Sequence, residues 1–169
     1  EALVKDLLIE LRVEDAKEIG EASECVEDVK ELIVAEISDD MIELRWCNDL
    51  EPDNIVNQLK LQQILLNLMR NGLQAMPDGG TLSCRFASDA EELVFEVQDT
   101  GHGIPDSDLR KIFDPFFTSR PTGTGLGLWI VSRLTHSMNG RIEVFSRPGE
   151  GARFEVRLPR EARHVSIEA

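Results

Sequence analysis

Hydrophobic side chains recur every three or four residues in three stretches of the chain, a spacing that predicts amphipathic helices packed on a core. The predicted helices cover residues 22–36, 57–76 and 126–138. Asn57 is suited to cap the second helix, and the turn-forming run that begins at Pro77 ends it. Asn139 and Gly140 end the third helix, because both residues adopt the left-handed conformation readily.

Alternating hydrophobic and polar residues predict strands in the remaining stretches. The predicted strands cover residues 41–46, 81–86, 93–99, 141–146 and 152–158. Short polar turns separate the second strand from the third and the fourth from the fifth, so each pair is expected to form a hairpin. This order of elements predicts an α+β fold, a two-layer α/β sandwich in which three helices cover a mixed, mostly antiparallel sheet of about five strands.

Residues 100–124 interrupt this pattern. They are rich in Gly, Pro, Ser and Thr and show only a short helical pattern near residues 109–113. So long an irregular segment inside a domain is usually functional. We therefore expect a mobile lid over about residues 104–124.

The first residues of the chain also have a helical pattern. Residues 1–13 place Leu3, Leu7 and Leu11 on one face, but a helix this short requires a partner in water. The chain opens on Glu1 inside this pattern, so we expect it to be part of a longer protein. That longer protein can be membrane-bound. No apolar run is long enough to span a bilayer, and no direct membrane contact is expected of this domain.

The chain is strongly acidic, with a formal net charge of −14. Because nucleic acids require a broad basic face, no nucleic-acid partner is expected. Binding an anionic ligand would need local positive potential from helix N-termini, backbone N–H groups, a few arginines and a divalent cation. Cys25, Cys47 and Cys84 are scattered without metal-ligand spacing, as expected of reduced thiols in a cytoplasmic protein.

Asn67 and Asn71 lie one turn apart on the predicted helix 57–76 and follow Gln63, so the three form a polar stripe. Arg70 and Gln74 flank this stripe. It can be a solvated surface. It can also be a site where neutral carboxamides face phosphate groups and a carboxamide oxygen ligates Mg²⁺ without adding negative charge.

Asp99 ends a predicted strand and is followed by Gly101 and Gly103. An ordinary turn would have this pattern. The same pattern suits a site in which the carboxylate accepts a hydrogen bond from the amino group of adenine while the glycines let the backbone approach the base. His102, which lies between the glycines, is expected to have no role.

Phe113 and Phe116 bracket an Asp-Pro pair in a polar stretch, and Phe117 follows them. In such a stretch, aromatic side chains are expected to anchor the lid on the core. Arg120 lies shortly after these residues, and together with Arg70 it is a candidate source of local positive charge.

Gly123, Gly125 and Gly127 lead directly into the predicted helix 126–138. Exposed N–H groups and the partial positive charge of a helix N-terminus favour phosphate at such a place. The glycines follow an irregular segment rather than a strand, and no Walker lysine accompanies them. A dinucleotide-binding fold and a P-loop are therefore excluded.

In this order the four motifs resemble the ATP-binding catalytic domain of sensor histidine kinases, in the superfamily shared with gyrase, Hsp90 and MutL. The resemblance covers about residues 22–160 and implies a Bergerat-type ATP-binding fold. It implies ATP or ADP with Mg²⁺ as ligands, with Asn71 as the Mg²⁺ ligand, Asn67 beside the phosphates, and Asp99 on adenine. Asn67, Asn71 and Arg120 would be the catalytic residues.

The resemblance implies a larger set of nucleotide contacts around these residues. The expected contacts are Asn67, Arg70, Asn71, Asp99, Gly101, Gly103, Ile104, Phe113, Phe116, Thr118, Gly123, Thr124, Gly125, Leu126, Gly127 and Leu128. Three positions depart from the family pattern: Gly72 replaces Ala, Gln74 replaces Lys, and Ala152 replaces Thr. Gly72 costs about 1 kcal/mol of local helix stability, and the other two departures point to weaker nucleotide binding.

The resemblance also implies an organisation and a reaction. Residues 1–20 would be the end of a dimerisation helix and a linker, residues 21–160 the ATP-binding catalytic domain, and residues 161–169 a flexible tail. The domain would transfer the γ-phosphoryl group to a histidine on a dimerisation domain, with the receiver domain of a response regulator downstream in two-component signalling. The fragment itself is expected to be a cytoplasmic monomer.

The side chain at position 67 favours transfer over hydrolysis. ATP-hydrolysing relatives carry a Glu that activates water there, and Asn67 cannot act as a general base. His102, His136 and His164 lack the acidic-flanked helical context of a phosphoacceptor, so we expect no self-labelling. The alternatives are an anti-sigma-factor-type serine kinase, a non-catalytic nucleotide sensor and, disfavoured by Asn67, an ATPase like gyrase or MutL.

Overall fold

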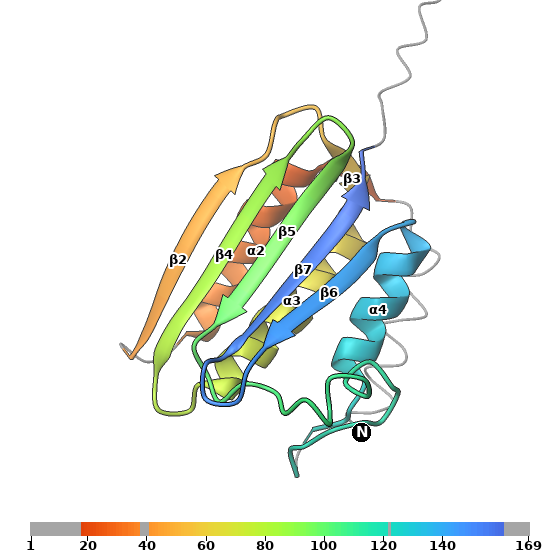
Figure 1. Ribbon diagram of the computed structural model, residues 1–169. Coiled ribbons are helices and arrows are strands. Elements are labelled where there is room, and N and C mark those ends of the chain that lie inside the picture. Colours follow the sequence, from red (N-terminus) through yellow and green to blue (C-terminus); the bar gives the residue numbers. More distant parts are fainter. Residues whose placement is uncertain (1–17, 38–40, 122, 161–169) are drawn as a thin grey trace, which may run out of the picture.

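The computed structural model describes residues 18–37, 41–121 and 123–160. In these residues three helices lie on one face of a five-stranded sheet (Figure 1). The predicted helix over residues 1–13 and the predicted tail 161–169 lie outside the described residues. In the described part of the chain, no helix has the length and apolarity that crossing a membrane requires.

The three predicted helices are confirmed. Their bounds are Ala22–Glu36 for α2, Gln58–Ala75 for α3 and Gly127–Ser137 for α4. Asn57 caps α3 as predicted, because its Oδ1 accepts a hydrogen bond from the Lys60 backbone N–H at 3.0 Å. Asn139, with φ of 57°, adopts the left-handed conformation just after α4.

The sheet has the strand order β2-β4-β5-β7-β6. The strands are β2 (Ile42–Asp49), β4 (Gly80–Ser88), β5 (Glu92–Asp99), β6 (Arg141–Ser146) and β7 (Ala152–Pro159). Three pairs are antiparallel, β4–β5, β5–β7 and β6–β7, whereas β2 runs parallel to β4. Both predicted hairpins and the mixed, mostly antiparallel sheet of the α+β sandwich are confirmed.

A small second sheet escaped prediction. Strand β1 (Ile19–Glu21) pairs antiparallel with β3 (Ile55–Asn57), and each leads directly into a helix. The first N–H of α2, at Ala22, donates to Asn54 O at 2.8 Å, and the first N–H of α3, at Gln58, donates to Glu18 O at 2.8 Å. The pair thus satisfies helix amides that would otherwise lack partners, but strands of three residues are too short to produce a periodic pattern.

Residues 106–113 form consecutive turns, so the short helix predicted near residues 109–113 is wrong. The amides of Lys111 and Ile112 both donate to Asp108 O, at 2.7 and 3.0 Å, which mixes tight and helical turn types. Pro105 and Pro115 enclose this stretch. Pro115 disfavours helical geometry at Asp114, so a helix here could not continue toward Phe116.

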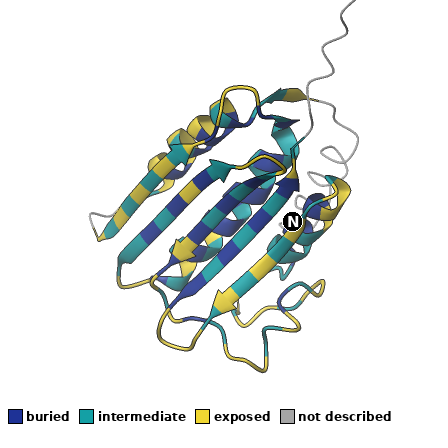
Figure 2. Ribbon diagram, turned by 45° about the horizontal axis from the view of Figure 1, so that its top comes forward, coloured by how far each residue is buried: buried dark blue, intermediate teal, exposed yellow. Residues whose placement is uncertain are grey.

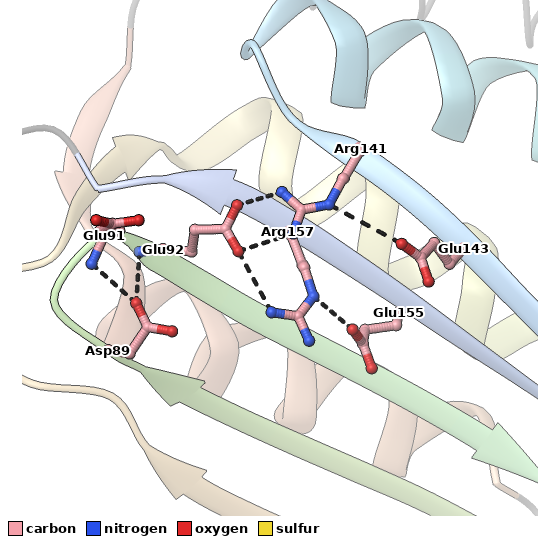
Figure 3. Close-up of polar contacts among 7 residues, drawn as sticks. All are labelled: Asp89, Glu91, Glu92, Arg141, Glu143, Glu155 and Arg157. Atoms are coloured by element: carbon pink, nitrogen blue, oxygen red, sulfur yellow. Dashed lines mark hydrogen bonds and ion pairs between the residues drawn. The ribbon is translucent and has the colours of Figure 1, made fainter.

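The two faces of the sheet differ sharply. Along β5 and β7 buried residues alternate with more exposed ones (Figure 2), and the buried ones belong to the core that the helices share. The outer face carries paired charges: Glu92 accepts hydrogen bonds from Arg141 and Arg157, and Arg157 also donates to Glu155 at 2.5 Å (Figure 3). Each exposed pair is worth little by itself, but charge on this face explains why the helices cover only the other.

The cysteines of the described residues are unpaired. Cys25 and Cys84 are buried and Cys47 is exposed. Both lie in the hydrophobic core, and this burial raises the pKa of each thiol to about 12, so both stay protonated near neutral pH.

Removing the cap of α3 should destabilise the whole domain, because α3 packs on the sheet and on both other helices. We expect Asn57→Ala to lower the free energy of unfolding by about 1 kcal/mol in urea titrations. Asn57→Asp keeps an acceptor for the Lys60 amide and should retain most of the stability. An alanine variant as stable as the wild type would contradict the role of the cap.

Candidate functional site

The polar stripe of α3 faces the start of α4 rather than open solvent. Asn67 donates from Nδ2 to Gln63 O at 2.9 Å. A Cβ on Gly127, the first residue of α4, would lie 3.2 Å from Asn67 Oδ1 and 4.0 Å from Asn71 Nδ2. The structure therefore brings both carboxamides against the N-terminus of α4.

The N-terminus of α4 has features that suit an anion. Its N-cap residue is Leu126, whose side chain caps no N–H group, and its first turn contains no acidic residue. The Thr124 hydroxyl accepts a long hydrogen bond of 3.4 Å from the Leu126 amide. The first amides of a helix without a side-chain cap remain available to a ligand, and the helix dipole adds partial positive charge.

Asp99 lies at the end of β5 with only 4% of its surface exposed. One carboxylate oxygen, Oδ1, accepts hydrogen bonds from the backbone amides of Gly101 at 2.8 Å and Ala152 at 3.3 Å. The second oxygen, Oδ2, accepts no hydrogen bond from the residues that the structure describes. A buried carboxylate with one oxygen fixed and the other available is ready to accept from a ligand amino group.

Burial raises the pKa of the Asp99 carboxyl above its ordinary value, although the two amides and nearby His102 act in the opposite direction. A raised native pKa means that the folded state disfavours the charged form. The contribution of Asp99 to folding is therefore most favourable below its ordinary pKa and declines as the pH rises through the raised value. A buried carboxylate that is ionised at neutral pH despite this unfavourable free energy is typical of a functional site.

Gly72 explains how Asp99 comes to lie beside α3. A Cβ at position 72 would lie 2.9 Å from Leu82 Cδ1 and 3.3 Å from Asp99 Cβ. The Gly72 backbone is therefore in close contact with Leu82 and with Asp99 at the end of β5. No sequence pattern indicates this contact, because it depends on how a helix and two strands pack.

Gly101 makes the next contact between the same loop and α3. Its Cβ would lie 2.4 Å from Ala75 O, and the His102 amide donates to that oxygen at 3.2 Å. Gly103 has a φ of 71°, which favours glycine. The loop that follows Asp99 is thereby held against the last turn of α3.

The aromatic anchors of the lid are confirmed in part. Phe113 and Phe117 pack against the core, as does Ile104 at the start of the lid. Phe116 does not, and its prediction as an anchor is wrong, because the side chain is 61% exposed. Its backbone has a φ of 67°, and its amide donates to Gly125 O at 2.9 Å, so this left-handed turn leaves the ring in solvent.

Arg120 joins the lid to the stripe on α3. Its Nη2 donates to Asn71 Oδ1 at 2.8 Å, and its Nη1 donates to Gln74 Oε1. Burial lowers the pKa of the guanidinium, which nonetheless stays charged near neutral pH. The Thr118 hydroxyl accepts from the Arg120 amide at 3.1 Å, so Thr118 shapes the turn that presents this arginine.

Arg70 lies apart from this group. Its guanidinium makes hydrogen bonds of 2.5 to 3.1 Å with both carboxylate oxygens of Glu36 on α2. Helix α2 and helix α4 flank α3 on opposite sides (Figure 1). The structure therefore assembles Asn67, Asn71, Arg120 and Gly127, but it does not bring Arg70 to them.

The last residues of the lid return to the core before α4. The Gly123 amide donates to Arg120 O at 3.2 Å. Leu126 is fully buried, and Leu128 packs against the core from the first turn of the helix. This anchoring fixes the position of the α4 N-terminus.

Residues 56–162 match the family model of the histidine kinase-, DNA gyrase B-, and HSP90-like ATPases. Sporulation kinase C of Bacillus subtilis (strain 168) is 40% identical over 103 residues, which are 61% of this chain and 24% of that protein. The signal transduction histidine-protein kinase AtoS of Escherichia coli (strain K12) is 41% identical over 114 residues, 66% of this chain and 18% of that protein. The chain thus spans a quarter or less of the length of these relatives.

Solved structures are similar over most of the chain. Full-length ShkA in complex with AMPPNP matches with a TM-score of 0.79 and 28% identity, covering 95% of this chain and 36% of that one. The nucleotide-free catalytic domain of the histidine kinase ThkA matches with a TM-score of 0.74 and 27% identity, covering 85% and 95%. The four motifs and the fold agree with these matches, and the chain belongs to the histidine kinase-, DNA gyrase B-, and HSP90-like ATPase family, as a catalytic domain of the sensor histidine kinase type.

Proposed function

We propose that this chain binds Mg²⁺·ATP between α3, the Asp99 loop and the lid, and presents the γ-phosphoryl group to a histidine on a dimerisation domain. One observation carries the proposal. The buried Asp99 carboxylate has one oxygen fixed by two backbone amides and the other without a partner among the described residues, and it packs against α3 at Gly72, next to Asn71 in the chain.

The Asp99 carboxylate suits adenine. Its Oδ2 would accept a hydrogen bond from the exocyclic amino group, whereas guanine carries a carbonyl oxygen at the corresponding place and would repel it. Gly101 and Gly103 have no side chains to obstruct the base. Ala152 donates a hydrogen bond to Asp99 through its backbone amide. A Thr at this position would have the same amide, so this contact is independent of the side chain.

The phosphates would lie where α4 begins. The amides at that N-terminus, which the Leu126 side chain does not cap, the Gly-rich segment before it and the neutral Asn67 and Asn71 offer donors without negative charge. Mg²⁺ would be held by Asn71 Oδ1 and would neutralise charge on the phosphates. Arg120 donates to that same oxygen here, so it must leave Asn71 for the metal to be ligated, which frees its guanidinium for the terminal phosphate.

Transfer rather than hydrolysis follows from the side chain at position 67. Asn67 is a carboxamide whose Nδ2 donates to Gln63 O, so it has no proton-accepting group to activate water. Catalysis would rest on positioning and charge neutralisation. The dimerisation domain and a response regulator would be the partners in the cytoplasm, as the histidine kinases similar to this chain suggest.

Transfer of label tests this function. The chain is fused behind a helical hairpin that carries a phosphoacceptor histidine, incubated with γ-labelled ATP, and compared with the same fusion lacking the histidine. We expect acid-labile label only in the first fusion. Acid-stable label on serine would indicate the serine-kinase alternative, ATP binding without label a nucleotide sensor, and rapid release of free phosphate an ATPase, and each would contradict the proposal.

Replacing Asp99 by Asn should abolish ADP binding without harming the fold. The amide retains Oδ1 for Gly101 and Ala152 but replaces Oδ2 by a donor, which would face the donor group of adenine. Because burial raises the pKa of Asp99, the neutral variant should unfold at a urea concentration no lower than the wild type at pH 7. Calorimetry with ADP checks this, and unchanged binding would show that Asp99 does not contact the base.

Replacing Arg120 by Ala should have opposite effects on Mg²⁺ binding and on phosphoryl transfer. Loss of its hydrogen bond to Asn71 removes a competitor of Mg²⁺, so less Mg²⁺ should be needed for half-maximal ADP binding. Transfer from ATP should fall by about tenfold or more, because the terminal phosphate loses a cationic donor. Arg110→Ala removes the same charge from an exposed position of the lid and is the control. Equal behaviour of the two variants would refute this role of Arg120.

A further inference from the structure

The segment between Asp99 and the lid lies on the turn that joins β6 to β7. The amide of Gly149 in this turn donates to His102 O at 2.8 Å. A Cβ on Gly103 would lie 2.1 Å from Arg147 O, so only glycine fits there. The turn and the irregular segment lie at the same end of the sheet (Figure 1). The loop is thus clamped between α3 on one side and the β6–β7 turn on the other.

The hydroxyl of Ser146 joins these two parts of the chain. It accepts a hydrogen bond from the Ile104 amide at 2.8 Å and donates to Gly151 O at 2.7 Å. Both distances are those of well-formed hydrogen bonds, and the side chain is partly buried. One hydroxyl therefore fixes a backbone amide at the start of the lid and a backbone carbonyl in the turn.

Each partner of this hydroxyl lies next to a part of the nucleotide site. Gly151 has a φ of 82°, and its Cβ would lie 2.0 Å from Asp99 O, so its backbone is in direct contact with that of Asp99. The next amide, of Ala152, donates to Asp99 Oδ1. Ile104 packs on the core and precedes Pro105, which favours extended backbone there. It is thus the last fixed residue before the turns of the lid.

We propose that Ser146 is a positioning residue, whose hydroxyl holds the hinge of the lid and the back of Asp99 in the geometry that binds nucleotide. This inference rests on the proposed function, which assigns adenine to Asp99 and places the nucleotide against the lid. Ser146 has no contact with the nucleotide in this account. It acts through Ile104 and Gly151, and the sequence motifs did not include it.

Two variants and one control test the role of the hydroxyl. Ser146→Ala removes it, and Ser146→Thr retains it with a side chain that suits a strand. Ser88→Ala is the matched control, because the Ser88 hydroxyl also accepts a backbone amide, that of Glu51, at the opposite end of the sheet. Amide hydrogen exchange is measured at Ile104 in protein without nucleotide, and ADP affinity is measured by calorimetry.

We expect exchange at Ile104 to be about tenfold faster in Ser146→Ala and ADP affinity to be about tenfold weaker, the effect of losing one or two hydrogen bonds of ordinary net strength. Ser146→Thr should restore both, and Ser88→Ala should change neither. If the Ser146 hydroxyl only stabilised the fold, Ser146→Ala would lower the free energy of unfolding without a selective increase in amide exchange at Ile104.

Three results would overturn the inference: unchanged Ile104 exchange, unchanged ADP affinity in Ser146→Ala, or a folded threonine variant that restores neither. These failures differ from failure of the proposed function, in which the wild-type chain itself does not bind ADP. In that case the inference falls with the function, whereas a wild type that binds ADP and a serine variant that binds equally well refute the inference alone.

Discussion

The close approach of α3 to the end of β5 is the contact on which the site depends. Gly72 has no side chain, so Leu82 and Asp99 can pack directly against the helix. Asn71 directly precedes Gly72 in α3, and Asn67 lies one turn before Asn71. A single helix therefore sets the distance between the proposed adenine acceptor and the proposed metal ligand. The other faces of α3 bury Leu61, Ile64, Leu65, Leu68 and Met69, which fixes the helix on the sheet.

Because the chain is acidic, binding of phosphates depends on the local distribution of charge. With a formal net charge of −14, the domain as a whole repels anions. Arginines of the outer sheet face such as Arg141 and Arg157 are engaged by Glu92. The start of α4 has no acidic residue in its first turn, and Arg120 is held by neutral carboxamides rather than carboxylates. Positive potential is thus retained where phosphates are proposed to bind.

Much of this arrangement could be predicted from periodic patterns. The helices, the two hairpins and the cap at Asn57 follow from residues close in sequence, and the four motifs identified the family. Contacts between distant segments left no such pattern. The pairing of β1 with β3 and the bridge from Ser146 to Ile104 depend on three-dimensional packing alone.

The errors have the same origin. Phe116 was expected in the core because aromatic residues usually lie there, but a left-handed turn leaves it exposed. Arg70 lies one residue before Asn71, yet its guanidinium is directed to Glu36 on α2. Sequence identified which residue types the chemistry needs, and only tertiary structure decides which of them face the same space.

A crystal structure of the chain with Mg²⁺ and a non-hydrolysable ATP analogue tests the central claim most directly. The account predicts the adenine amino group within hydrogen-bond distance of Asp99 Oδ2, the metal on Asn71 Oδ1, and the Arg120 guanidinium moved from Asn71 to the terminal phosphate. A nucleotide whose base lies away from Asp99, or a bound metal with Arg120 still on Asn71, would contradict it.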